Sequence, residues 1–358
     1  MLTEGTQIPN TGRKLSHCRE YSRIALVAPT PHNRRDEPPL RPAASMLSYL
    51  ARRLLATIPV MAIVAVLVFS MLRLTPGDPA AIIAGAAATS QDVAEIRARL
   101  GLDRPIVAQF FVWIGRLATG DFGESFFFKK QVADLIADRI GPTFALATTT
   151  MLLSIVVAVP LGVLAAWKQG TWIDRIVMGF SVLGFSVPVF VIGYVLIYVF
   201  AIELSWLPVQ GYQPLREGPW GFLQRLILPS ITLSVIYIAL IARITRTSVL
   251  DVLSEDYIRT ARAKGLPNRV VLMRHALANA AVPIVTVIGI GVALLIGGVV
   301  VTESVFSIPG LGRLTVDAVL ARDYPTVQAV ILLFSAVYVL LNLVVDVAYT
   351  LLDPRIRY

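Results

Sequence analysis

Six runs of apolar residues, separated by polar stretches, dominate the pattern of this chain from about residue 54 onward. Crossing the hydrocarbon core of a bilayer as a helix takes about 20 such residues. The runs cover residues 54–72, 143–166, 176–201, 227–243, 283–306 and 327–350. The pattern therefore predicts an all-α integral membrane protein with six transmembrane helices. The fourth run is the shortest, and its start at Leu228-Pro229 suits a proline in the first turn of a helix.

Two of the runs contain residues that break helices. Pro160 and Gly162 interrupt the second run, and Gly184 and Pro188 interrupt the third. Backbone freed at this depth is tolerated where it is buried in protein or lines a water-filled cavity. The third run is thus a candidate lining for a pathway through the membrane, and a kink that only aids packing is the alternative. The candidate lining residues are Ser181, Ser186, Pro188 and Tyr194.

Lysine and arginine gather in the polar stretches on one side of the six runs. These stretches are Arg52-Arg53, the turn 168–175, the segment 243–274, and Arg355 with Arg357. Basic residues beside membrane spans mark the cytoplasmic face. We therefore expect both termini in the cytoplasm of a cell with an inner membrane.

The opposite side receives a large segment, 74–140, which we expect to be helical. Ser90 is the predicted cap of a first helix with acidic residues in its first turn. Residues 106–117 form a second, amphipathic run that lies at the membrane interface or packs on the outer ends of the spans. A third short helix is predicted over 129–140, leading to Pro142.

The most informative polar stretch is 255–283, here called the hook. A basic amphipathic segment breaks at Gly265-Leu266-Pro267 and resumes as a second basic helix. We expect Gly265 to end the first helix in a left-handed conformation, with Pro267 starting the next. Such a structured hook suits a partner protein on the inner side of the membrane.

The hook resembles the cytoplasmic EAA loop of the inner-membrane subunits of ATP-binding-cassette importers. Thr260-Ala261-Arg262 stands where that family often has Glu-Ala-Ala, and Gly265 follows three residues later. The residues of the motif in this chain are similar to those of the dipeptide, oligopeptide and nickel permease branch of the family. Four further motifs agree with that branch: LTPGDP at 74–79, PGLGR at 309–313, RDYP at 322–325 and LDPR at 352–355. The resemblance covers residues 46–358, as one permease domain.

The resemblance implies a type-1 importer-like subunit that works in a complex. Its implied partners are a second, homologous permease subunit, two ATP-hydrolysing subunits and an extracytoplasmic solute-binding protein. Dipeptides or oligopeptides are the implied substrates, with nickel, glutathione or another small solute as alternatives. The implied ATPase-coupling residues are Tyr257, Arg259, Thr260, Ala261, Arg262, Lys264, Gly265 and Leu266.

Composition narrows the classes of protein to which the chain can belong. Hydrophobic residues make up 56% and charged residues 15%, against about a quarter charged in soluble domains. The net charge of +9 does not indicate nucleic-acid binding, because it is not gathered into a patch interleaved with aromatics. The single cysteine, Cys18, excludes intrachain disulfides, and three histidines without paired spacing give no metal site.

The sequence carries no catalytic arrangement and predicts no cofactor. It has no phosphate-binding Gly-x-x-x-x-Gly-Lys-Ser/Thr loop, so ATP hydrolysis would belong to other subunits. A membrane-embedded enzyme would need converging catalytic groups, whereas the charges scatter. An ion-coupled secondary transporter would place an ionisable group near the midplane. Glu303 and Asp346 lie near span ends instead. We expect Glu303 to form a helix-end ion pair, with contact to a peptide amine or a cation as the alternative. We expect Asp346 to pair with an arginine.

Residues 1–45 differ from the rest. They are polar, contain six prolines and show no periodic apolar face, which predicts disorder. The segment beginning at Met46 resembles the natural N-terminus of a permease. Residues 1–45 are therefore interpreted as a misassigned start, with a regulatory tail as the alternative.

Overall fold

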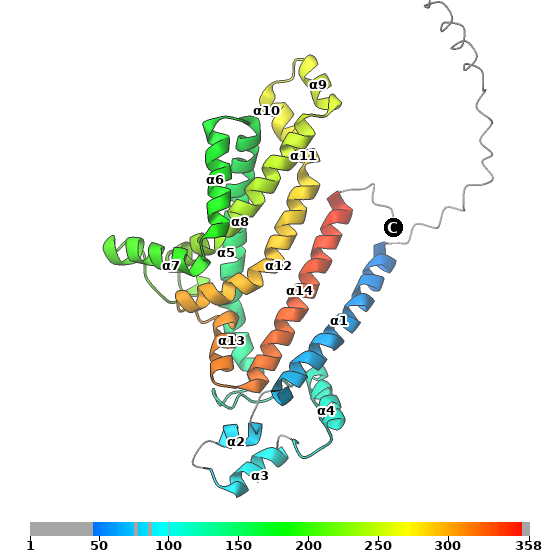
Figure 1. Cartoon of the computed structure of the whole chain (residues 1–358), viewed down its shortest axis with the longest axis vertical. Helices are drawn as coiled ribbons and strands as arrows, with labels where there is room; N and C mark the ends of the chain where they lie inside the picture. The colour runs from blue at the N-terminus through cyan, green and yellow to red at the C-terminus, as the bar shows by residue number, and fades with distance from the viewer. Residues whose placement is uncertain (1–45, 75–77, 85–87, 100, 353–358) are drawn as a thin grey trace, which may run out of the picture.

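The computed structural model describes residues 46–74, 78–84, 88–99 and 101–352, which fold into helices joined by loops (Figure 1). The predicted disorder of residues 1–45 lies outside the described part of the chain. So do the last residues of the LDPR motif and part of the LTPGDP motif.

Within these described residues, five helices are long and apolar enough to cross a membrane. They are α1 (Met46–Leu74), α5 (Val132–Trp167), α8 (Pro219–Leu253), α12 (Ala281–Val305) and α14 (Tyr324–Leu352). A sixth candidate is the pair formed by α6 (Trp172–Ser186) and α7 (Val189–Leu196), which the π-helical turn η3 (Ile197–Glu203) extends. The two arms meet at 104°. The predicted six spans are therefore present when this bent pair counts as one.

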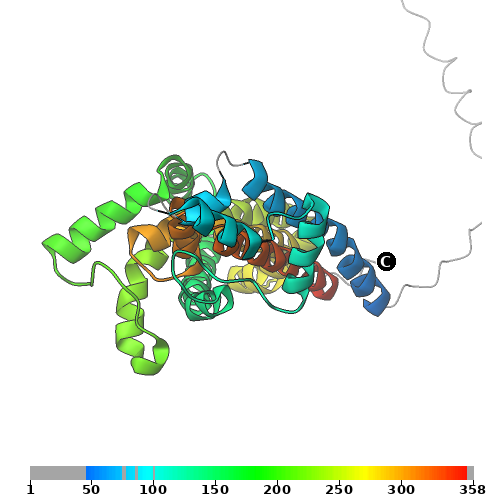
Figure 2. The ribbon, with the colours of Figure 1, turned by 90° about the horizontal axis from the view of Figure 1, so that it is seen from below.

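The bend falls where the sequence predicted an interruption. Val187 ends α6 in an extended conformation, and Pro188 immediately precedes α7. Proline disfavours a helical conformation in the residue before it, which explains the break at Val187. The break turns the chain far more than a kink would: α7 projects sideways from the bundle, on the side away from α1 (Figure 2).

Two boundary predictions were wrong. The fourth span is not the shortest: α8 has 35 residues, begins at Pro219 and carries Pro229 in its interior. The second span is not interrupted at Pro160, and the separate helix predicted over 129–140 is continuous with it through Pro142 as the 36-residue α5. Both prolines of α5 and Pro229 of α8 are thus accommodated inside helices, as membrane helices permit when neighbours satisfy the freed backbone.

The core lies between α5 and α8, which form the most extensive helix pair. Gly162 makes that approach possible: a Cβ there would lie 2.6 Å from both the Ala242 carbonyl oxygen and the Thr245 Cβ. The hydroxyls of Thr149 and Ser230 join the same two helices at 2.8 Å. Gly162 is therefore a packing residue and not an interruption of the helix.

One end of the molecule carries α2 (Pro79–Ala84), α3 (Ser90–Arg99), α4 (Ile106–Ala118) and α13 (Leu311–Leu320) (Figure 1). The cap of α3 is Thr89, not the predicted Ser90. Its backbone N–H and hydroxyl both donate to Asp92, whose own N–H donates back to the Thr89 hydroxyl. In α4, Phe110 and Trp113 pack on Phe69 of α1, so this helix does pack on the end of a span.

The opposite end carries the hook and the turn between α5 and α6 (Figure 1). The hook consists of α9 (Asp256–Ala263), α10 (Asn268–Val270), the π-helical η5 (Val271–Ala276) and α11 (Leu277–Asn279). Helix α1 begins toward this end and α14 finishes toward it. A short 3-10 turn, η4 (Leu215–Glu217), completes the described elements just before α8.

Candidate functional site: the hook and the helices behind it

The first hook helix, α9, ends as the sequence predicts. Gly265 has a φ of +79°, the left-handed conformation that favours glycine. The Leu266 N–H donates to the Ala261 carbonyl and the Gly265 N–H to the Arg262 carbonyl. These two bonds make a Schellman motif, which satisfies carbonyls left open at the helix end. Pro267 then caps the next helix in an extended conformation.

One face of α9 is buried against the second helix of the hook. Ile258 is completely buried, Ala261 is nearly so, and both pack with Val271. Leu266 covers the edge of this small cluster. The two-helix hook is thus held by its own apolar contacts. The predicted coupling residues Ala261 and Leu266 belong to this internal packing.

The opposite face of α9 is exposed and basic. The remaining predicted coupling residues are all exposed, on α9 or directly after it: Tyr257, Arg259, Thr260, Arg262, Lys264 and Gly265. Arg262 also lines a pocket between the hook and the ends of α5 and α8. Arg259 forms an exposed ion pair with Asp256 one turn earlier. Partial burial, together with the charge of Glu255, raises the pKa of the Tyr257 phenol, so its hydroxyl stays protonated at neutral pH. This face can contact a partner through cations and a neutral hydroxyl donor.

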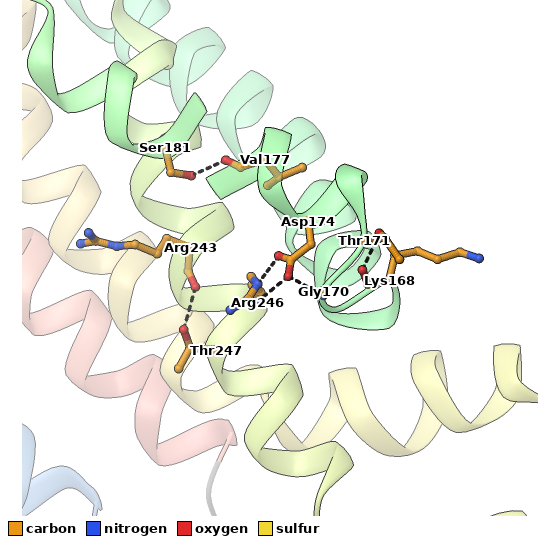
Figure 3. A network of polar contacts seen from close by, with 9 residues as sticks. All are labelled: Lys168, Gly170, Thr171, Asp174, Val177, Ser181, Arg243, Arg246 and Thr247. Carbon is orange, nitrogen blue, oxygen red and sulfur yellow. Dashed lines mark hydrogen bonds and ion pairs between the residues drawn. The ribbon is translucent and has the colours of Figure 1, made fainter. Parts of the chain in front are cut away.

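Behind the hook, a buried ion pair joins α6 to α8 (Figure 3). Arg246 of α8 donates from Nε and Nη2 to the two carboxylate oxygens of Asp174, at 2.5 and 2.8 Å. The Gly170 N–H donates to the same carboxylate at 2.9 Å. Asp174 is only 5% exposed. A bidentate arginine–carboxylate pair fixes both distance and orientation, so the N-terminal end of α6 and the last third of α8 are held together.

The predicted pathway residues do not converge on one surface. Ser181 is buried, and its hydroxyl donates to the Val177 carbonyl of its own helix. Ser186 and Pro188 are exposed at the bend, and Ser186 bonds back to Val182. Tyr194 is exposed on the projecting α7. The exposed residues at the bend stay predicted pathway residues, whereas the Ser181 side chain is packed inside the protein.

Glu303 makes a helix cap in place of the predicted helix-end ion pair. Its carboxylate is fully buried and accepts from the Thr143 hydroxyl at 2.6 Å and from the Arg313 N–H at 3.0 Å, at the start of α13. A carboxylate is favoured at a helix N-terminus by the open N–H groups and the helix dipole. This contact explains the first glycine of the PGLGR motif, because a Cβ on Gly310 would lie 2.1 Å from a Glu303 carboxylate oxygen.

The other span-end carboxylate, Asp346, is paired as predicted. Arg53 of α1 contacts it at 3.0 Å and ties α1 to α14. Asp323 of the RDYP motif is buried and accepts from the Ser125 and Thr326 hydroxyls and from the Phe126 N–H, so it also holds segments together. Within the described residues, no three histidine, cysteine or acidic side chains gather in a way that could hold a metal ion.

Sequence reasoning missed the Asp174–Arg246 pair. The partners are 72 residues apart, and each sits among other charges that flank a span. The available signal was an acidic residue in the first turn of an apolar helix together with an arginine about two turns before the end of another. Neither position alone indicates that the two meet.

Two family models match the chain. The model described as binding-protein-dependent transport system inner membrane component matches residues 158–358. The N-terminal model of the same membrane component matches residues 46–147.

Curated relatives align over most of the chain. A probable peptide ABC transporter permease protein, y4tP of Sinorhizobium fredii, is 57% identical over 310 residues, 87% of this chain and 99% of the relative. The glutathione transport system permease protein GsiC of Escherichia coli is 47% identical over 313 residues, 87% of this chain and 100% of the relative.

One solved structure resembles the fold. It is described as inward-facing conformations of the MetNI methionine ABC transporter in its CY5 native crystal form. The match has a TM-score of 0.50 and 18% identity, and it covers 61% of this chain and 96% of the other.

Proposed function

The chain belongs to the family of binding-protein-dependent transport system inner membrane components, and from that premise we propose that it passes peptides through the membrane while the hook couples it to ATP-hydrolysing subunits. It is a multi-pass membrane permease subunit of an ABC importer and not itself an enzyme. The proposal adds the substrate class, the coupling residues and the make-up of the complex. Residues 46–358 form the transport unit in this proposal, and residues 1–45 are dispensable.

The exposed basic face of α9 is the observation that carries the coupling proposal. Its residues Tyr257, Arg259, Thr260 and Arg262, with Lys264 just after the helix, are exposed, while Ile258 locks the other face. A helix held on one side and open on the other can fit a groove of an ATPase and move with it as a rigid body. A loop without its own packing would absorb that motion.

The path from the hook into the membrane runs through α8. Its last residue, Leu253, is followed by Ser254 and Glu255 and then directly by α9. Movement of α9 therefore displaces the end of α8, and the Asp174–Arg246 pair carries the displacement to α6. Helix α6 leads to the bend at Pro188 and to α7, where the exposed candidate pathway residues lie. The hook is thus linked to the bend by the covalent connection of α8 to α9 and by the Asp174–Arg246 ion pair.

Peptides are proposed as substrates because y4tP, the 57% identical relative, is named a probable peptide permease. Glutathione, itself a tripeptide, is the second candidate, supported by the 47% identity to GsiC. Nickel complexes remain a weaker alternative from the motif resemblance alone. The complex is proposed to contain a second permease subunit, two ATPases and a binding protein, with the hook and both termini in the cytoplasm.

Cross-linking tests the coupling proposal. Cys18 is replaced by serine, and a cysteine is placed at Thr260, exposed on α9, or at Thr119, exposed after α4 at the opposite end. A short bifunctional reagent is added to the assembled complex. We expect Thr260→Cys to cross-link to the ATPase and Thr119→Cys to cross-link to the binding protein or to nothing. ATPase cross-links from Thr119→Cys and none from Thr260→Cys would place the ATPase at the wrong end and refute the proposal.

Binding measurements on the partner solute-binding protein test the substrate class. Titration calorimetry compares a dipeptide, a pentapeptide, glutathione and nickel. Tight binding of the peptides supports the proposal, whereas binding of glutathione alone selects the second candidate. Binding of nickel alone would refute both.

A further inference from the structure

An apolar groove of about 380 Å³ runs between α5 and the second helix of the hook. Its α5 wall includes Val159, Val163 and Leu164, and its hook wall includes Leu272, Met273 and Leu277. The volume falls within the range of small-ligand sites. Nearly all of its lining is hydrocarbon, so water gains few hydrogen bonds inside it and an apolar chain can displace that water favourably.

The groove opens onto a surface suited to lipid. Leu152, Val156, Pro160 and Leu164 repeat every four residues along α5, and all four are exposed and apolar. A stripe of this kind on a membrane-spanning helix faces hydrocarbon when no protein covers it. Since Pro160 and Leu164 also line the groove, an acyl chain can pass from the bilayer into it without crossing a polar surface.

The hook end of the groove is basic and aromatic. Trp167 and Arg269 line it, and the Lys168 ammonium lies 4.9 Å from the centroid of the Trp167 ring. Tryptophan is enriched where a helix leaves the membrane. Among the described residues, neither Lys168 nor Arg269 forms an ion pair with a carboxylate. Two cations therefore stand beside an apolar slot at the hook end of α5.

We propose that this groove binds an anionic phospholipid, with one acyl chain between α5 and η5 and the headgroup phosphate at Arg269 and Lys168. Basic pockets between helices at the membrane surface recognise acidic headgroups. Charge complementarity selects an anionic lipid over a zwitterionic one, because the groove adds hydrocarbon contacts for any lipid but cations only for a net negative headgroup. The lipid then braces the second hook helix against α5. This inference does not depend on the transported substrate.

Fluorescence quenching in nanodiscs tests the site. The complete complex is placed in phosphatidylcholine discs that contain increasing amounts of brominated phosphatidylglycerol or, in parallel, brominated phosphatidylcholine. The signal of Trp167 is the difference between the parent complex and its Trp167→Phe variant. We expect half-maximal quenching of Trp167 at a roughly fivefold or more lower fraction of the anionic lipid, since one cation at a membrane surface contributes about a fivefold preference.

Three variants separate the groove from diffuse surface charge. Arg269→Gln removes a groove cation and should reduce the preference about fivefold. Arg274→Gln removes an exposed cation in the same helix that does not line the groove, and it should leave the preference unchanged. Val163→Phe fills the groove with all charges intact and should weaken the quenching of Trp167 by both lipids, because it removes the space for the acyl chain.

Three outcomes would overturn the proposal. Equal quenching by both lipids would mean a non-selective lipid-facing surface. An equal loss in Arg274→Gln and Arg269→Gln would mean that the general charge of the hook attracts the lipid. Absence of Trp167 quenching by either lipid would mean that protein, such as a second permease subunit, covers the groove.

Discussion

Gly265 has a φ of +79°, and a Cβ built there would meet nothing within 4 Å. The cost of replacing it is therefore backbone strain and not collision. For Gly265→Val we expect the end of α9 to lose about 1–3 kcal/mol of conformational preference, because a β-branched residue resists the left-handed region. Membrane insertion should be normal, while co-purification of the ATPase and ATP-driven uptake fall sharply.

Asparagine provides the matched control at this position. It adopts the left-handed conformation more readily than other non-glycine residues. Gly265→Asn should therefore retain most of the ATPase association and uptake that Gly265→Val loses. Full uptake by the valine variant would contradict a role for the shape of the hook in coupling.

The Asp174–Arg246 pair is the second residue-scale feature open to test. Removing one partner leaves a largely buried charge, which costs about 3–5 kcal/mol. Asp174→Ala and Arg246→Ala should each lower the stability of the detergent-solubilised protein, measured as a denaturation midpoint. The double variant should be no worse than the worse single variant, because the two changes remove one interaction.

Arg243→Ala is the control for that pair. Arg243 lies one turn earlier on α8, is exposed, and stacks over the Phe185 ring at 5.5 Å, pointing away from Asp174 (Figure 3). Loss of an exposed cation–π contact costs about 0.5–1 kcal/mol. A loss in Arg243→Ala as large as that in Arg246→Ala would show that the ion pair has no special role.

At the scale of elements, the contact between α5 and α8 depends on Gly162. In Gly162→Ala the new Cβ would lie 2.6 Å from the Ala242 carbonyl oxygen, so one helix must move. Overpacking of this kind costs about 1–3 kcal/mol. We expect a lower denaturation midpoint and lower yield of assembled complex.

Gly141→Ala tests whether that effect comes from packing. Gly141 lies in the same helix with nothing within 4 Å of its Cβ position. Alanine is favoured over glycine in a helix interior by about 1 kcal/mol. Gly141→Ala should therefore be as stable as the parent or slightly more so. If both variants lose stability equally, the approach of α5 to α8 is not what Gly162 provides.

At the scale of the whole molecule, the source of energy for transport distinguishes the importer from an ion-coupled carrier. Asp346 pairs with Arg53, which is about half exposed, and such pairs contribute about 0–1 kcal/mol. Asp346→Asn should leave uptake by vesicles of the complete complex dependent on ATP. Uptake should persist when an uncoupler collapses the proton gradient and stop when a non-hydrolysable ATP analogue replaces ATP.

The opposite result would favour a secondary carrier. In that case uptake would follow the proton gradient without ATP and would fail in Asp346→Asn. The parent complex, measured with the same uncoupler at constant ATP, provides the control. The buried Glu303 is no substitute coupling group in this reading, because its carboxylate is committed to Thr143 and to the start of α13.

Several features were set by the sequence alone because their causes are local. Runs of apolar residues of sufficient length specify membrane helices wherever they occur, so the positions of the spans could be read along the chain. The end of α9 depends on Gly265 and its neighbours within six residues, and the break before α7 depends on Pro188. The membrane permease class followed from these features and from the motifs around them.

Only the tertiary structure decided features whose partners are distant in sequence. Pro229 and Pro142 lie inside helices because packing across the bundle outweighs the local cost of proline. Asp174 meets Arg246, and Glu303 caps α13, because folding brings segments together that no periodicity relates. Likewise, Ala261 proved to be internal and Arg259 exposed only once α9 was seated on Val271. A buried charge must find a partner in three dimensions, and the linear pattern does not name that partner.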